Sequence, residues 1–180
     1  MRNDLWSLKA TFVCIAFSVS CSSTTSKSSD DDQMPPTTTQ ADVEAWLATG
    51  KYKSWHCEAA PHAPRGPSAH GPFNRICTNN LVSSNATATG VWPKGAAAVK
   101  EFYATQSAAT PASYALYAKT QADSANGANW FYYEKAPDGT LYAKGELGAT
   151  ICTGCHGAAG TDAAHTPSPG GRDFVYTPVP

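Results

Sequence analysis

The segment "CTGCH", residues 152–156, constrains this chain more than any other feature. It places two thiols three positions apart and follows them at once with an imidazole, as covalent attachment of a c-type haem requires. The thiols of Cys152 and Cys155 add to the two vinyl groups, and His156 turns under the ring to ligate the iron. The segment therefore predicts one covalently attached haem c.

Two other chemistries use paired cysteines near a histidine. Half of a zinc knuckle needs a second ligand pair at similar spacing, and the sequence contains none. A thioredoxin-like redox pair opens a helix after a strand in a βαβ unit. Both alternatives stay open from the sequence, although haem attachment explains the segment better.

Haem attachment of this kind implies export, and the amino terminus agrees with it. Residues 1–21 carry Arg2 and Lys9, then an apolar run that is too short to span a bilayer, then small residues before Cys21. The segment predicts a signal peptide, and Cys21 is similar to the lipidated residue of bacterial lipoproteins. The alternative is ordinary cleavage near Ser20 with a soluble product. We expect a periplasmic protein that is held to a bacterial membrane only by a lipid anchor.

The remaining cysteines form an even pair. Once the leader, the lipid and the haem have been assigned, Cys57 and Cys77 are left, and an oxidising compartment favours a disulfide between them.

Composition divides the chain into three parts. Residues 22–40 are rich in Ser, Thr, Pro and Asp and predict a disordered tether. Residues 41–180 are long enough for one compact haem domain. The chain has 13 basic and 14 acidic residues, so no basic field points to nucleic acid.

The pattern of the domain predicts an α+β fold, mainly an antiparallel β-sheet with short helices. Residues 41–50 have the apolar spacing of a helix that ends at Gly50. Short aromatic or β-branched runs separated by Gly, Pro and Asn then predict successive strands. These runs cover residues 74–84, 96–104, 113–121, 129–136 and 140–147, and the haem segment follows them on a short helix or turn.

The ligand opposite His156 is not methionine, because Met1 and Met34 lie in the predicted leader and tether. A second His, a Lys or an open position remains, and we favour the open position, which binds small ligands. The candidate histidines are His56, His62, His70 and His165. Arg75 is a candidate for a bidentate contact to a haem propionate, with an exposed strand-end arginine as the alternative.

Four segments in order resemble the cytochrome P460 family and its relative cytochrome c prime beta. They are "SAHGPFNRICTN" (68–79), "GAAAVKEFY" (95–103), "ANWFYYEK" (128–135) and "CTGCH" followed by "RDFVYT" (172–177). The resemblance implies a mostly antiparallel sheet, usually in a homodimer, with His156 as proximal ligand. It also implies that Lys100 matches the lysine that bonds to the porphyrin edge in cytochromes P460. The alternative for Lys100 is a strand lysine that pairs with Glu101 or Glu134.

The resemblance implies one of two functions, each with a redox partner protein. Cytochromes P460 oxidise hydroxylamine, with nitric oxide, to nitrous oxide, and Lys100 is then part of the catalytic centre. The c prime beta branch binds nitric oxide or carbon monoxide without turnover. The distal carboxylate of the first group is expected near Ala115 to Tyr117, where this chain has none. Tyr114, Tyr117, Phe131 and Tyr133 are candidates for an apolar cap on the distal face instead.

Overall fold

The fold is one antiparallel sheet with a helix on each face, and it is known from a computed structural model. The structure describes residues 34–65, 70–85, 91–160 and 172–176. The predicted leader, Cys21 and His165 lie outside these residues. The helices and strands are α1 (Gln40–Thr49), η2 (Lys51–Ser54), β1 (His56–Cys57), β2 (Phe73–Thr78), α2 (Asn80–Ser83), β3 (Ala97–Tyr103), β4 (Ser113–Lys119), η3 (Ala125–Gly127), β5 (Trp130–Lys135), β6 (Leu141–Leu147) and α3 (Thr150–His156).

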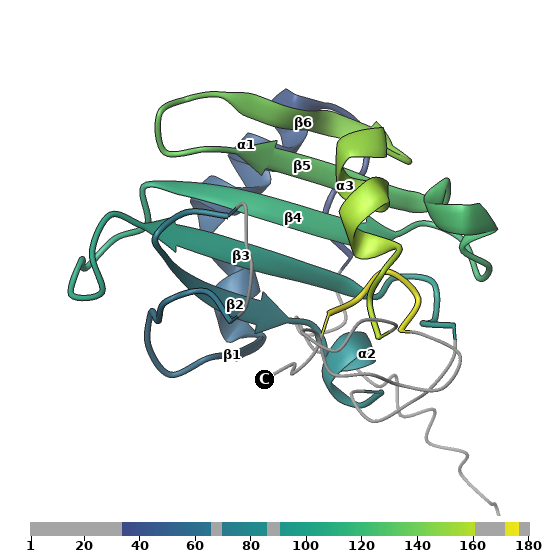
Figure 1. The fold of residues 1–180 in the computed structure, drawn as a ribbon, viewed down its shortest axis with the longest axis horizontal. Coiled ribbons are helices and arrows are strands. Elements are labelled where there is room, and N and C mark those ends of the chain that lie inside the picture. Colours follow the sequence, from purple (N-terminus) through teal and green to yellow (C-terminus); the bar gives the residue numbers. More distant parts are fainter. Residues whose placement is uncertain (1–33, 66–69, 86–90, 161–171, 177–180) are drawn as a thin grey trace, which may run out of the picture.

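The strands follow one another across the sheet in the order β1-β2-β3-β4-β5-β6, and every neighbouring pair is antiparallel (Figure 1). This confirms the predicted α+β class. The turn between β5 and β6 contains Gly139 with a φ of 90°, a conformation that glycine adopts without strain because it has no Cβ. The predicted strand over 74–84 is wrong in its second half. There Asn79 caps α2 by accepting a hydrogen bond from Val82 N, because a short amide side chain competes for backbone donors.

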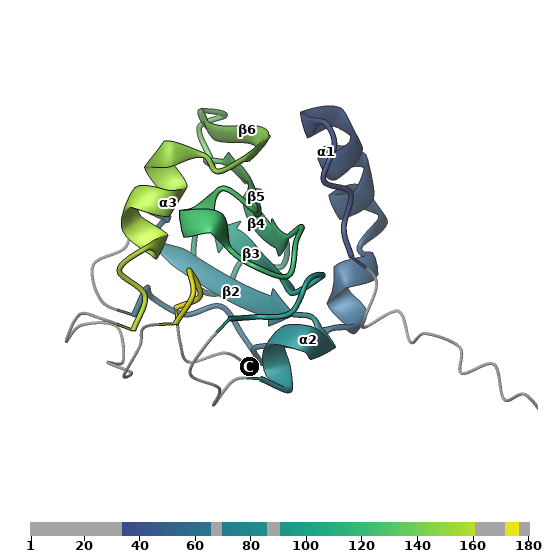
Figure 2. The ribbon, with the colours of Figure 1, turned by 90° about the vertical axis from the view of Figure 1, so that its right-hand side faces the viewer.

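Side chains alternate between the two faces of the sheet, so each strand contributes to two separate cores. Figure 2 shows the sheet edge-on between α1 and α3. We call the two sides the α1 face and the α3 face. The core of the α1 face contains Val43, Leu47, Tyr52, Trp55, Cys77, Ala97, Val99, Leu116, Ala118, Phe131 and Tyr133. The core of the α3 face contains Val82, Trp92, Ala96, Trp130, Tyr132, Ala143, Ala149 and Val175.

The compact part of the chain begins before the predicted boundary at residue 41. Met34 packs against the core of the α1 face, and Thr39 caps α1 by accepting from Asp42 N. The only methionine among the described residues is therefore on the side of the sheet opposite α3.

The predicted disulfide is confirmed. Cys57 and Cys77 are a directly opposed pair of the β1–β2 ladder, and their sulfurs are bonded. None of the helices in the described part of the chain has the length and apolar character that a membrane crossing needs.

Candidate metal centre

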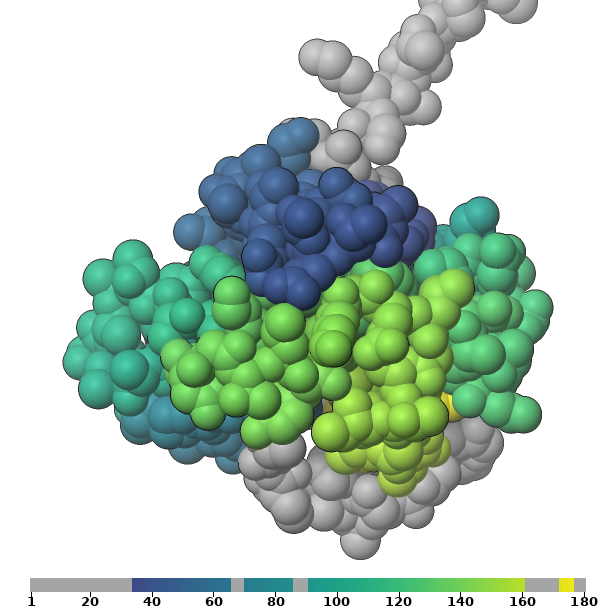
Figure 3. Space-filling view, turned by 90° about the horizontal axis from the view of Figure 1, so that it is seen from above, coloured from purple at the N-terminus to yellow at the C-terminus, as the bar shows by residue number. Residues whose placement is uncertain are grey.

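Helix α3 presents the predicted haem segment at the surface of the sheet. The thiols of Cys152 and Cys155 are both free, the first half-buried and the second exposed. Burial raises the pKa of Cys152 to about 12. In the space-filling view of Figure 3, α3 and the edge strand β6 lie side by side at the surface.

His156 points inward from α3 and is surrounded by aromatic rings. Its ring centroid lies 5.8 Å from that of Tyr117 and 5.7 Å from that of Tyr132. Burial lowers the pKa of His156 to about 4, so the imidazole is neutral at pH 7, the form that binds metal. Nδ1 lies 2.8 Å from the carbonyl oxygen of Phe174. A carbonyl only accepts, so Nδ1 carries the proton and Nε2 keeps its lone pair for a metal.

Lys100 lies on the α3 face, as the family resemblance requires. Burial lowers the pKa of its ammonium group, against the opposing pull of Glu134 and Glu58. Lys100 pairs in register with Ala115, and Ala115 pairs with Glu134 on the next strand. The three residues therefore form one row across β3, β4 and β5, with the smallest side chain in the middle.

A carboxylate does lie on this face, although in the sequence it does not lie near Ala115 to Tyr117, where the resemblance led us to expect one. Glu134 is 7 % exposed, and its Oε1 lies 2.9 Å from Nδ1 of His70. The ring of His70 stacks on Phe102 with an interplanar angle of 9° and lies 6.4 Å from the ring of His156. From the sequence, Glu134 was considered only as a partner of Lys100, because the carboxylate was expected on the segment that forms β4, whereas the row runs from strand to strand.

The other candidate residues are placed elsewhere. His56 is exposed on β1, and Nε2 of His62 contacts Glu58 at 2.9 Å. Arg75 donates from Nε to Glu101 Oε2 at 2.6 Å on the α1 face. Successive residues of a strand point to opposite faces, so Glu101 and its partner Arg75 lie on the face opposite Lys100. The structure thus does not bring Arg75 to the haem segment.

The predicted aromatic cap is only partly correct. Tyr117 lies on the α3 face, but Tyr114, Phe131 and Tyr133 pack on the α1 face. Tyr132 takes their place, and its buried hydroxyl has no hydrogen-bond partner within the described ranges.

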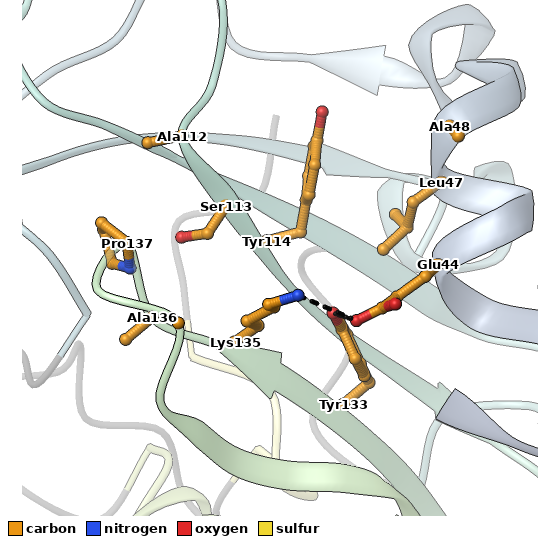
Figure 4. A pocket seen from close by; sticks show the side chains of 11 residues that line it. Glu44, Leu47, Ala48, Ala112, Ser113, Tyr114, Tyr133, Lys135, Ala136 and Pro137 are labelled. Carbon is orange, nitrogen blue, oxygen red and sulfur yellow. Dashed lines mark hydrogen bonds and ion pairs between the residues drawn. The ribbon is translucent and has the colours of Figure 1, made fainter. Parts of the chain in front are cut away.

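A cavity of about 300 Å³ lies on the α1 face, away from the haem segment. Figure 4 shows Glu44 there in contact with Tyr133 and Lys135. Lys135 and Glu44 are both more than a third exposed, so this pair is an ordinary surface ion pair.

The residues on the α3 face fit a haem. The donor set is two free thiols and a neutral imidazole with Nε2 available, beside an aromatic surface and an unpartnered buried hydroxyl. The zinc alternative gains no support, because the described residues contain no cluster of three or more His, Cys, Asp or Glu side chains that could hold a metal ion. The thioredoxin alternative is disfavoured because the described strands form a meander without a βαβ unit.

Comparison with known proteins gives one family. The family model described as Cytochrome P460 matches residues 49–177, which include every strand and helix of the α3 face. No curated protein and no solved structure matches the chain.

Proposed function

Because this chain belongs to the cytochrome P460 family and is therefore a haem-binding cytochrome, we propose that it carries one haem c attached through Cys152 and Cys155. His156 is the proximal ligand through Nε2, since Nδ1 is held by the Phe174 carbonyl. When bound, the haem supplies an iron that exchanges electrons and binds small ligands.

The proposed activity is redox chemistry of small nitrogen compounds, hydroxylamine and nitric oxide, with a redox partner protein that takes the electrons. The observation that carries it is the Glu134–His70 pair on the same face as His156. Oxidising hydroxylamine removes protons together with electrons, so the reaction needs a base beside the bound substrate. Glu134 accepts the proton, and His70 passes it towards the surface.

The test replaces Glu134 by Gln, which keeps the shape and removes the base. Glu146→Gln is the matched control, because Glu146 pairs with Tyr132 but is exposed at the edge strand. We expect hydroxylamine-dependent reduction of an electron acceptor to fall roughly 100- to 10,000-fold in Glu134→Gln, with nitric oxide binding retained. Equal rates in the two variants would refute the role of Glu134.

A second candidate function is non-enzymatic gas binding or electron transfer of the cytochrome c prime beta type. The apolar surroundings of Tyr117 and Tyr132 favour it. It predicts nitric oxide binding by a five-coordinate ferrous haem and no consumption of hydroxylamine by the wild type. A six-coordinate, low-spin ferrous spectrum would instead show that a second protein side chain, such as His70, ligates the iron.

Lys100 is proposed to bond to the porphyrin edge: its Nζ replaces a hydrogen on an edge carbon, which releases two protons and passes two electrons to an oxidant such as hydrogen peroxide. The burial of Lys100 supports this, because desolvation lowers the pKa of its ammonium group and so favours the neutral, nucleophilic amine. The acid-denatured, reduced pigment tests the bond directly. An ordinary c-haem spectrum from that sample would show that the bond is absent.

The proposed location is the periplasm, with residues 1–20 removed and Cys21 lipidated, and the haem domain held by the residues that follow Cys21. We also propose a homodimer. Mass measurement of the mature chain tests the first proposal, since it should begin at Cys21 and carry both lipid and haem. Light scattering of the chain without its anchor tests the second.

A further inference from the structure

A short segment after α3, residues 172–176, makes hydrogen bonds to the helix in addition to those within the helix itself. We call these residues the strap. Its Phe174 carbonyl accepts from His156 Nδ1 at 2.8 Å, and the hydroxyl of Tyr176 donates to the Cys155 carbonyl at 2.6 Å. Val175 is fully buried in the core of the α3 face. The strap thus fixes both the ring of His156 and the end of the helix that carries it.

The strap has an unusual backbone that needs external support. Asp173 and Phe174 have φ values of 44° and 67°, a region that side chains other than glycine seldom occupy. Two consecutive residues of this kind persist only where surrounding contacts hold them. This backbone aims the Phe174 carbonyl at His156.

The support comes from the carboxylate of Asp173. Oδ2 accepts from Lys119 Nζ at 2.8 Å and from the backbone N–H of Trp92 at 2.8 Å, and Oδ1 accepts from the hydroxyl of Ser124. Lys119 has a fully buried side chain, and its ammonium also lies 5.7 Å from the ring centroid of Trp130. The ion pair thus links the end of β4 to the strap.

We infer that Lys119 and Asp173 are positioning residues for the proximal ligand, which they orient and make more electron-donating through the Phe174 carbonyl. A hydrogen bond from Nδ1–H raises the basicity of a histidine ligand and fixes its orientation, and loss of such an outer contact typically costs roughly 10- to 100-fold in metal affinity or activity. The inference rests on the proposed haem ligation by His156.

The experiment compares three variants of the full chain, produced with haem. Lys119→Met removes the buried cation, and Asp173→Asn removes the charge with a residue that tolerates a positive φ. Arg75→Met is the matched control, because it breaks an ion pair to the buried Glu101 on the other face. Each protein is measured for haem mass, stability in urea, reduction potential, and the iron–histidine stretching band of the ferrous form by resonance Raman.

We expect Lys119→Met and Asp173→Asn to move the stretching band to lower frequency and to raise the potential. Arg75→Met should lose stability with the band and potential of the wild type. An unmoved band in both Lys119→Met and Asp173→Asn, or an equal movement of the band in Arg75→Met, would overturn the inference. Absence of haem from the wild type, seen directly in its mass, would refute the proposed function and this inference with it.

Discussion

Removal of the Cys57–Cys77 disulfide should destabilise the domain by about 3 kcal/mol. The bond closes a loop with a sequence separation of 20. The chain-entropy relation for a loop of that length gives about 11 cal/mol/K, or about 3 kcal/mol at 25 °C. For a domain of this size the midpoint of thermal unfolding should fall by about 10 °C.

The bond also matters to the candidate site. Strand β1 has two residues and pairs only with β2, so the cross-link fixes the start of the connection that carries His70. Without it, we expect faster amide hydrogen exchange in β1 and a weaker contact between His70 and Glu134.

The assay is urea unfolding of Cys57→Ala/Cys77→Ala beside the wild type. Cys77 is fully buried, so loss of its sulfur adds a packing cost. Wild-type protein with this disulfide selectively reduced is the matched control, since it keeps both sulfurs and loses only the cross-link. The denaturant slope should rise in both samples, because the unfolded chain becomes more expanded. An unchanged midpoint and slope in the reduced wild type would refute the entropic argument.

Three further substitutions test contacts on the two faces of the sheet. Burial raises the pKa of Glu101, but hydrogen bonds from Arg75 and two tyrosines outweigh it and hold the pKa below 4.5. The charged form therefore adds stability above about pH 4.5 that is lost as pH falls through the folded pKa, and urea titrations of Glu101→Gln should lose this acid-sensitive part. Gly127→Ala should lower stability by about 3 kcal/mol in urea and shift the strap, because φ is 93° and a Cβ would lie 2.8 Å from Phe174 Cε1. Asn79→Ala should cost about 2 kcal/mol in thermal unfolding, since this buried amide caps α2 and bonds to the Gly95 carbonyl. If any one of these variants is as stable as the wild type, the stabilising role assigned to that residue is wrong.

Strands were predictable here because their signals are local. Aromatic runs such as the one that became β5 end at Gly, Pro or Asn, and the observed bounds of β3 to β6 differ from the predicted ones by two residues at most. Helix α2 was missed because the alternating pattern of β2 runs on into "NNLVSS". The Asn79 cap was the signal that could have found it.

The haem segment could be proposed from the sequence alone, but the residues that surround it could not. Glu134 and Lys100 lie 34 positions apart in the chain, and only the register through Ala115 puts them in one row. The role of Phe174 was invisible for another reason. Its contact with His156 is made by a backbone carbonyl, which every residue type possesses.

The order of the strands has a consequence for how this protein is assembled. Each strand pairs with the one that precedes it, so a chain emerging from its amino end can complete all six strands through short-range steps. The thiols of Cys152 and Cys155 on α3, which we propose attach the haem, arrive after the whole sheet. The sheet surface that faces the haem can thus fold before the residues that bind the haem are in place. Slow haem attachment therefore need not delay folding of the sheet.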